Sequence, residues 1–140
     1  MAVKTLTIGP GKLSIGSDVL IQQFESQVTS VKLVPNVETE DAINVLSGEQ
    51  VAGDRSESFT LEGSMLQDFG DTNSRTEWCF AHRGEEHPFS FQPNSAKGKK
   101  ITGTLVVEAI EIGGDARTKA QSDFEFQVIG APVIATVTIP

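Results

Sequence analysis

The sequence predicts a mainly β protein, a β-sandwich or barrel of about eight short strands with one short α-helix. Stretches with alternating apolar and polar residues occur throughout the chain, and turns rich in Gly and Pro separate them. Helix signals occur at one place, from Ser74 to Arg83. The 140 residues suit a single domain, residues 1–140, and the lone cysteine excludes an internal disulfide. Stability must therefore come from packing or from self-association.

The first long β-compatible stretch runs from Ile21 to Pro35 and is polar on both faces through its middle. Side chains such as Gln23, Glu25 and Gln27 need water on at least one side, so this strand cannot lie wholly inside a core. We expect it to line a wet surface or channel. An ordinary edge strand, protected or paired, is the alternative.

A long acidic loop is predicted around residues 36–55. Between positions 36 and 57, six carboxylates stand against Arg55 alone, a net charge of −5 within the −8 of the whole chain. The basic cluster is the run KGKK further along the chain. This separation of signs can bring complementary surfaces together, although a solvated loop and a solvated turn are the commoner explanation. The carboxylates are Glu38, Glu40, Asp41, Glu49, Asp54 and Glu57, and the lysines are Lys97, Lys99 and Lys100.

Period-two alternation predicts further strands in the rest of the chain. Strands are expected in SFTLEGSML (58–66), DFEFQVIG (123–130) and VIATVTI (133–139), and the apolar residues of ITGTLVVEAIEI (101–112) on both faces predict a strand covered on both sides. The runs IGGD and GAP are expected to be turns, and residues 115–121 a loop. The residues expected to point into the core are Phe59, Leu61, Met65, Phe124, Phe126 and Val128.

The predicted helix has signals at both ends. Ser74 is placed as the N-cap, with Glu77 three residues on to complete a capping box. Arg83 falls in the last turn, and Gly84 is placed to stop the helix.

Catalytic and metal-binding patterns are weak in this sequence. Cys79, His82 and His87 carry suitable donor atoms for zinc, but Glu85 or Glu86 would have to complete an irregular set. Cys79 and His82 lack a third group to orient the histidine as a base. The GPGKL run lacks the residues of a phosphate-binding loop, and the net negative charge argues against phosphate-directed DNA binding. We expect no enzyme activity, no metal and no cofactor.

The order of several segments resembles the major tail tube proteins of long-tailed bacteriophages (siphophages). The likeness covers about Ile43 to Pro132, and FTLEGSMLQD, IGGD and SDFEFQVIGAP carry most of it. The N-terminal forty residues match only in character. The resemblance implies a structural virion protein with a β-sandwich and one helix. Such subunits form hexameric rings that stack into a hollow tube, through which double-stranded DNA passes during ejection into the host.

The resemblance also implies partners and surfaces. The partners are further copies of the chain, the tape-measure protein, the tail tip and the tail terminator, and assembly takes place in the bacterial host cytoplasm, without membrane insertion. DNA passes without specific binding. Gln23, Glu25 and Gln27 are candidates to face the lumen. Candidate contacts between rings or subunits are Glu38, Glu40, Asp41, Lys97, Lys99, Lys100, Arg117 and Lys119.

Two other readings stay open at this point. The inner tube of a contractile tail, or of a related secretion or gene-transfer device, would share the architecture. A β-sandwich module that binds a carbohydrate or a protein is the second, and the absence of Tyr and the single Trp weaken it. The start of the sequence has no apolar run of signal-peptide length, so we expect a soluble protein made inside the cell.

Overall fold

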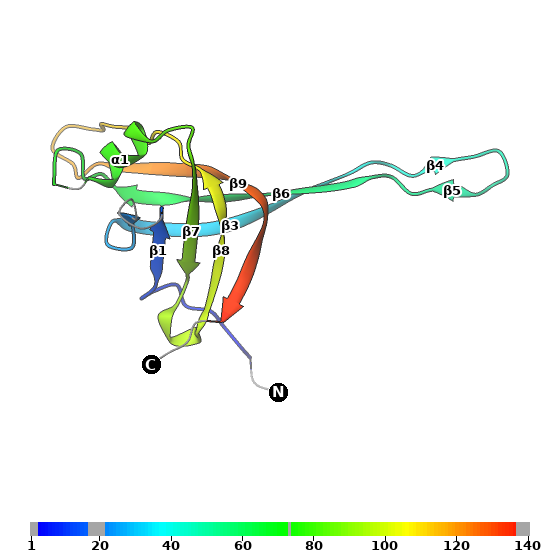
Figure 1. Cartoon of the computed structure of the whole chain (residues 1–140), viewed down its shortest axis with the longest axis horizontal. Coiled ribbons are helices and arrows are strands. Elements are labelled where there is room, and N and C mark those ends of the chain that lie inside the picture. The colour runs from blue at the N-terminus through cyan, green and yellow to red at the C-terminus, as the bar shows by residue number, and fades with distance from the viewer. Residues whose placement is uncertain (1–2, 17–21, 73, 137–140) are drawn as a thin grey trace.

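The computed structural model describes residues 3–16, 22–72 and 74–136, and it is mainly β with one α-helix, which confirms the predicted fold class. Figure 1 shows a compact body with a long hairpin projecting from it. The elements are β1 (Lys12–Ile15), β2 (Gln22–Gln23), β3 (Val28–Thr39), β4 (Ile43–Asn44), β5 (Gln50–Val51), β6 (Arg55–Leu66), α1 (Arg75–Ala81), β7 (Glu86–Gln92), a 3₁₀ turn (Ser95–Lys97), β8 (Lys99–Val106) and β9 (Gln121–Thr136).

Seven strands form one antiparallel sheet in the order β2-β1-β7-β8-β9-β6-β3, and β4 pairs with β5 in the hairpin. In Figure 1, β3, β6 and the start of β9 run along the long axis, whereas β1, β7 and β8 cross them. The sheet therefore folds over on itself. Leu13 of β1 and Val28 and Val31 of β3, which lie toward opposite ends of the strand order, line the same cavity.

Strand β9 belongs to both halves of the folded sheet. Its first half pairs with β6, and its end pairs with β8. Between them the register shifts, so that residues 130–132 lie opposite Gly103 alone, and Gly130 has a φ of +71°. Positive φ is accessible to glycine at little cost, which permits the bulge and the bend. The GAP run, predicted to be a turn between two strands, is instead the bend within one strand.

The core lies between the two halves of the sheet. Phe124, Phe126 and Val128 are buried, while the alternate Asp123 and Glu125 are exposed, so the predicted period of two is confirmed here. From β6, Leu61 and Met65 are also buried, as predicted, while Phe59 is partly buried and packs against the core. The other buried apolar side chains are Leu13, Ile15, Phe24, Cys79, Phe89, Phe91, Leu105, Val107 and Ile110.

The single strand predicted over 21–35 is interrupted: Gln22–Gln23 form β2 and β3 begins at Val28, while Ile21 lies outside the described residues. The chain turns at residues 24–27, where the Phe24 carbonyl accepts hydrogen bonds from the backbone N–H groups of Gln27 and Val28, both at 3.0 Å. Phe24 is completely buried and packs edge-on against Trp78, with ring centroids 6.5 Å apart. The chain thus leaves the extended conformation at the residue whose ring enters the core. β3 then begins at Val28 and continues past Pro35 to Thr39.

The predicted strand over 101–112 is too long. β8 ends at Val106, and the next residue, Val107, bonds with the turn before β7: its N–H donates to the Glu85 carbonyl at 2.8 Å, and its carbonyl accepts from Gly84 N–H at 2.6 Å. Val107 and Ile110 are buried without belonging to a strand. Their burial explains why the segment is apolar on both faces although it is not extended throughout.

The helix begins where the sequence predicts. Ser74 is the N-cap, and its hydroxyl accepts a hydrogen bond from Glu77 N–H at 3.2 Å. The Glu77 carboxylate, however, accepts from Gly70 N–H at 3.4 Å. The helix ends at Ala81 with His82 as the C-cap, so Arg83 lies beyond the last turn, contrary to expectation, and Gly84 follows with a φ of +83°.

A buried carboxylate that the sequence analysis missed holds the start of the helix. Asp68 accepts hydrogen bonds from the N–H groups of Arg75 and Thr76 at 2.8 and 3.0 Å, and from the hydroxyls of Ser74 and Thr76, both at 2.9 Å. Burial raises the pKa of Asp68, but these four hydrogen bonds to the ionised form outweigh burial and lower the pKa below its ordinary value. The arrangement satisfies N–H groups that a helix start leaves without intrahelical partners.

Across the described ranges, α1 is the sole α-helix, and it is far too short and polar to cross a membrane.

Candidate functional site

The most prominent feature of the molecule is the hairpin arm, residues 35–58, which projects from the body in Figure 1. Its strands continue the β3–β6 ladder to Thr39↔Arg55, and Glu40 N–H donates to the Asp54 carbonyl at 2.9 Å. At Gly53 the two strands approach so closely that a Cβ would lie 1.9 Å from the Glu40 carbonyl oxygen. Where the sequence predicts a long acidic loop, the chain thus forms a two-stranded hairpin, with strand pairing interrupted at residues 40–42 and 52–54.

The arm has no core of its own. Every residue from 35 to 58 is exposed except Gly53, which is half-buried. Five large apolar side chains are among the exposed ones, and Leu46 at the tip is fully exposed. An isolated two-stranded hairpin is only marginally stable in water, and clustered exposed apolar residues mark interaction surfaces. The arm is therefore a candidate contact surface. Its apolar residues are Val37, Ile43, Val45, Leu46 and Val51.

Charge covers the rest of the arm. Its six carboxylates and single arginine give a net charge of −5, and Arg55 pairs with Glu57 at 3.0 Å. Glu38, Glu40 and Asp41 all lie on the arm and are exposed. The arm therefore combines exposed apolar side chains, with Leu46 at its tip, and a net negative charge.

A groove of the opposite character lies at the start of β8. Its floor is apolar, with Leu6 and Ile134 exposed by 56% and 72%, and Lys97, Lys99 and Lys100 also line it. We call it the lysine-rimmed groove; Pro93, Asn94 and Ile101 complete its lining. The tip of the arm points away from this end of the body in Figure 1, so a contact between arm and groove would join two copies of the chain.

A second apolar patch lies beside the helix. Phe69, Phe80 and Ile112 are each about half exposed and line one shallow pocket. Arg83 lies over the Phe80 ring, 4.7 Å from the ring centroid to Cζ, and its Nη1 donates to the Phe80 carbonyl at 2.7 Å. The sequence analysis did not find this patch, because its three residues come from separate loops and one helix face.

The three residues predicted to face a lumen do not share a strand. Gln23 ends β2, and Glu25 and Gln27 lie in the turn that follows. Gln23 and Glu25 are exposed and Gln27 is half-buried. They still lie next to one another, between β2 and β3, which are the two edge strands of the sheet.

Arg117 and Lys119 lie in the loop between β8 and β9, and both are exposed. Arg117 has a φ of +65°, unusual for a residue other than glycine. The loop is fixed at its start, where the Gln67 side-chain amide donates to the Gly113 carbonyl at 2.8 Å and accepts from Gly113 N–H at 2.9 Å. The IGGD run is thus an anchored exit from the core segment, and the two basic side chains project beyond it.

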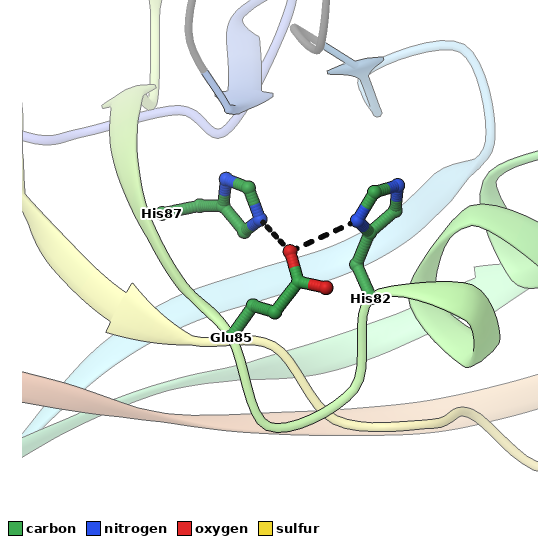
Figure 2. A group of neighbouring side chains, drawn as sticks. All are labelled: His82, Glu85 and His87. Atoms are coloured by element: carbon green, nitrogen blue, oxygen red, sulfur yellow. Dashed lines mark hydrogen bonds and ion pairs between the residues drawn. The ribbon is translucent and has the colours of Figure 1, made fainter.

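Figure 2 shows a cluster of two histidines and one glutamate between the helix and β7. Glu85 Oε1 lies 3.0 Å from His82 Nδ1 and 3.1 Å from His87 Nε2. These hydrogen bonds, from His82 first and then His87, lower the pKa of Glu85. Cys79, considered with these histidines from sequence, lies outside the cluster: it is fully buried, and burial together with the charge of Asp68 raises its pKa to about 12. A thiol with that pKa is not a nucleophile at neutral pH.

No family model matches the chain, and neither does any curated protein sequence. Its fold is nevertheless that of chains in gene transfer agent particles. A chain of the virion of a native gene transfer agent particle is 20% identical, with a TM-score of 0.61 over 89% of this chain and 95% of that one. A chain of the tail of an empty gene transfer agent particle, refined helically with C6 symmetry, is 19% identical, with a TM-score of 0.61 over 89% of this chain and 96% of that one. The predicted tail-protein resemblance is therefore confirmed for the fold.

Proposed function

We propose that this protein is the subunit of a tail tube, a structural protein without enzyme activity that assembles into hexameric rings stacked into a hollow conduit. The hairpin arm carries the proposal, because it exposes apolar side chains that the chain itself does not cover. A shared fold with a chain from a C6-symmetric tail supports it. Both features suit a protein that completes its packing only in an assembly.

Ring formation has a physical basis in the sheet. A ring of identical subunits uses head-to-tail contacts that close by rotation. In the described part of the chain, β2 and β3 are the sheet edges, and an exposed edge readily pairs with another chain. Pairing between neighbouring subunits in a ring would remove both edges and join the sheets into one barrel.

Contact between rings is assigned to the arm and the lysine-rimmed groove. The apolar tip with Leu46 matches the groove floor of Leu6 and Ile134, and the carboxylates of the arm match the lysines. Apolar burial would supply most of the affinity, whereas exposed ion pairs mainly fix register and partner choice. Glu38, Glu40 and Asp41 of one subunit, and Lys97, Lys99 and Lys100 of another, remain our candidate contacts between rings.

We propose that double-stranded DNA passes through the conduit. A lumen lined with Lys and Arg would hold a polyanion through many phosphate contacts, whereas a neutral or acidic lining lets it slide. The chain's net charge of −8 suits this role. Gln23, Glu25 and Gln27 remain our lumen candidates because they lie beside the sheet edges that ring closure would bring together. In a virion tail, the further partners would be the tape-measure, tail tip and terminator proteins.

Electron microscopy of the concentrated, purified protein tests the proposal. Tubes of constant width with sixfold rings in cross-section are expected. A chain that remains monomeric even with preformed tail tips or tube fragments as seeds would contradict it. Flexible and contractile tails share this subunit design, so the same images cannot assign the type of tail. A sheath gene beside the tube gene would assign it.

A further inference from the structure

The cluster of His82, Glu85 and His87 has the donor composition of a metal site. Two imidazole nitrogens and one carboxylate oxygen all lie within 4.8 Å of one another, and the carboxylate oxygen is 3.0 and 3.1 Å from the two nitrogens. Zinc binds such atoms at about 2.0–2.2 Å, which places neighbouring tetrahedral ligands about 3.3 Å apart. The two nitrogen-to-oxygen distances are already close to that value. The two imidazole nitrogens lie up to 4.8 Å apart, so the histidine side chains would have to move toward each other on binding.

The backbone holds these residues in place. His82 caps the helix and its carbonyl accepts from Glu85 N–H at 3.1 Å. The Glu85 carbonyl accepts a hydrogen bond from Val107 N–H, and His87 lies in β7 opposite Leu105 of β8. All three side chains therefore project from a short segment that is fixed at both ends, and a metal ion would not have to order a flexible loop.

The surroundings favour an ion on one side of the cluster. Trp78 forms a wall, with its ring centroid 4.8 Å from that of His82 and 5.2 Å from that of His87. His87 is buried, whereas the Glu85 side chain is 52% exposed. An ion bound here would have one apolar face and one face open to water, the arrangement of a three-ligand zinc site with a fourth position for solvent.

Among the described residues, Glu85 has no ion pair with a lysine or an arginine that would neutralise its charge. Within the described residues, the ion pairs of Glu85 are those with the two histidines. Arg83, the closest basic residue in sequence, is turned toward Phe80. The carboxylate is thus available as an anionic ligand.

We propose that His82 Nδ1, Glu85 and His87 Nε2 bind a divalent transition-metal ion of the zinc class. Both histidines would bind as neutral tautomers, with the proton on the other ring nitrogen. Imidazole donors favour zinc and similar ions over Mg²⁺ and Ca²⁺, which take oxygen ligands. Such an ion would fasten the C-terminal end of the helix to β7. This site is independent of the tube function and of the surfaces assigned to it.

Calorimetric titration of the full-length, tag-free protein with ZnCl₂ tests the proposal, with MgCl₂ and CaCl₂ as comparisons. One zinc ion per chain is expected, with no binding of the other two ions at the same concentrations. Glu85→Gln keeps the size of an exposed side chain and removes its charge, so the fold should survive. It should raise the zinc dissociation constant by about tenfold or more. Glu86→Gln, the same change at the next residue, should leave it unaltered.

Cobalt supplies a second readout. Co²⁺ bound at this site should show visible d–d absorption without the near-ultraviolet band of a thiolate ligand, since Cys79 is not in the cluster. The proposal is overturned if zinc does not bind below millimolar concentration, if Glu85→Gln binds it as well as the wild type does, or if the cobalt spectrum shows a thiolate.

Discussion

Replacing Leu46 at the tip of the arm separates assembly from folding. The side chain is fully exposed in the single chain, so Leu46→Ser removes no packed contact. Such surface changes alter the free energy of unfolding by about 0.5 kcal/mol or less. We therefore expect the melting temperature and the circular dichroism spectrum of the unassembled protein to be unchanged.

The effect on assembly should be much larger. If Leu46 is buried in the lysine-rimmed groove of a neighbouring subunit, its burial contributes about 1.5–3 kcal/mol. Each subunit added to a growing tube makes one such contact on average, so losing it should raise the critical concentration for assembly by about 10- to 150-fold. Sedimentation of assembled protein over a concentration series, with negative-stain images of the pellets, measures this quantity.

A neighbouring substitution provides the control. Ser47→Ala lies in the same exposed turn and leaves the apolar tip intact, so its critical concentration should match that of the wild type. Tubes of Leu46→Ser that form at the wild-type concentration would show that the tip is not buried on assembly. The arm would then lose its assigned role.

Three further predictions concern charge. Lys99→Glu should weaken tube formation, and adding Glu40→Lys should restore it in sedimentation assays; normal assembly of the single variants would disprove the pairing. Arg117→Glu with Lys119→Glu should weaken assembly without unfolding the chain, and unaffected tubes would remove both residues from the interface. Asp68→Asn should destabilise the chain by about 1–3 kcal/mol at neutral pH in urea titrations. Because the folded-state pKa of Asp68 is lowered, its contribution to the free energy of unfolding is complete above the unfolded pKa, about 3.9, and is lost as the pH falls through the folded value. An Asp68→Asn variant as stable as the wild type at pH 7 would refute this role.

Local patterns predicted the elements whose environment is set by their own residues. Alternation alone placed Phe124, Phe126 and Val128 in the core, because a strand with one buried face must alternate. Ser74 was predicted as the N-cap for a similarly local reason, since its hydroxyl reaches an N–H three residues away. The acidity of residues 36–57 and the cluster of lysines could also be identified from the sequence, because charge depends on composition alone.

Elements that depend on pairing or packing with another segment could not be predicted in this way. The bend of β9 at Gly130 exists because the strand serves two halves of one sheet, and a glycine next to a proline equally well suggests a turn. The break at Phe24 depends on a core space beside Trp78 that no local pattern describes. The acidic segment looked like a loop because its residues face solvent on both sides, whereas pairing with its own second strand makes it a hairpin.

The sequence by itself determined that this is an acidic, mainly β chain with one capped helix, because periodicity, capping and charge act over a few residues. Only the tertiary structure decided that the sheet folds over itself, that the acidic residues lie on a projecting arm, and that Glu85 lies between His82 and His87. The folded sheet depends on pairing between strands far apart in the chain, and the arm depends on pairing between its own two strands. The turn that carries Glu85 is held by backbone hydrogen bonds of Gly84 and Glu85 to Val107.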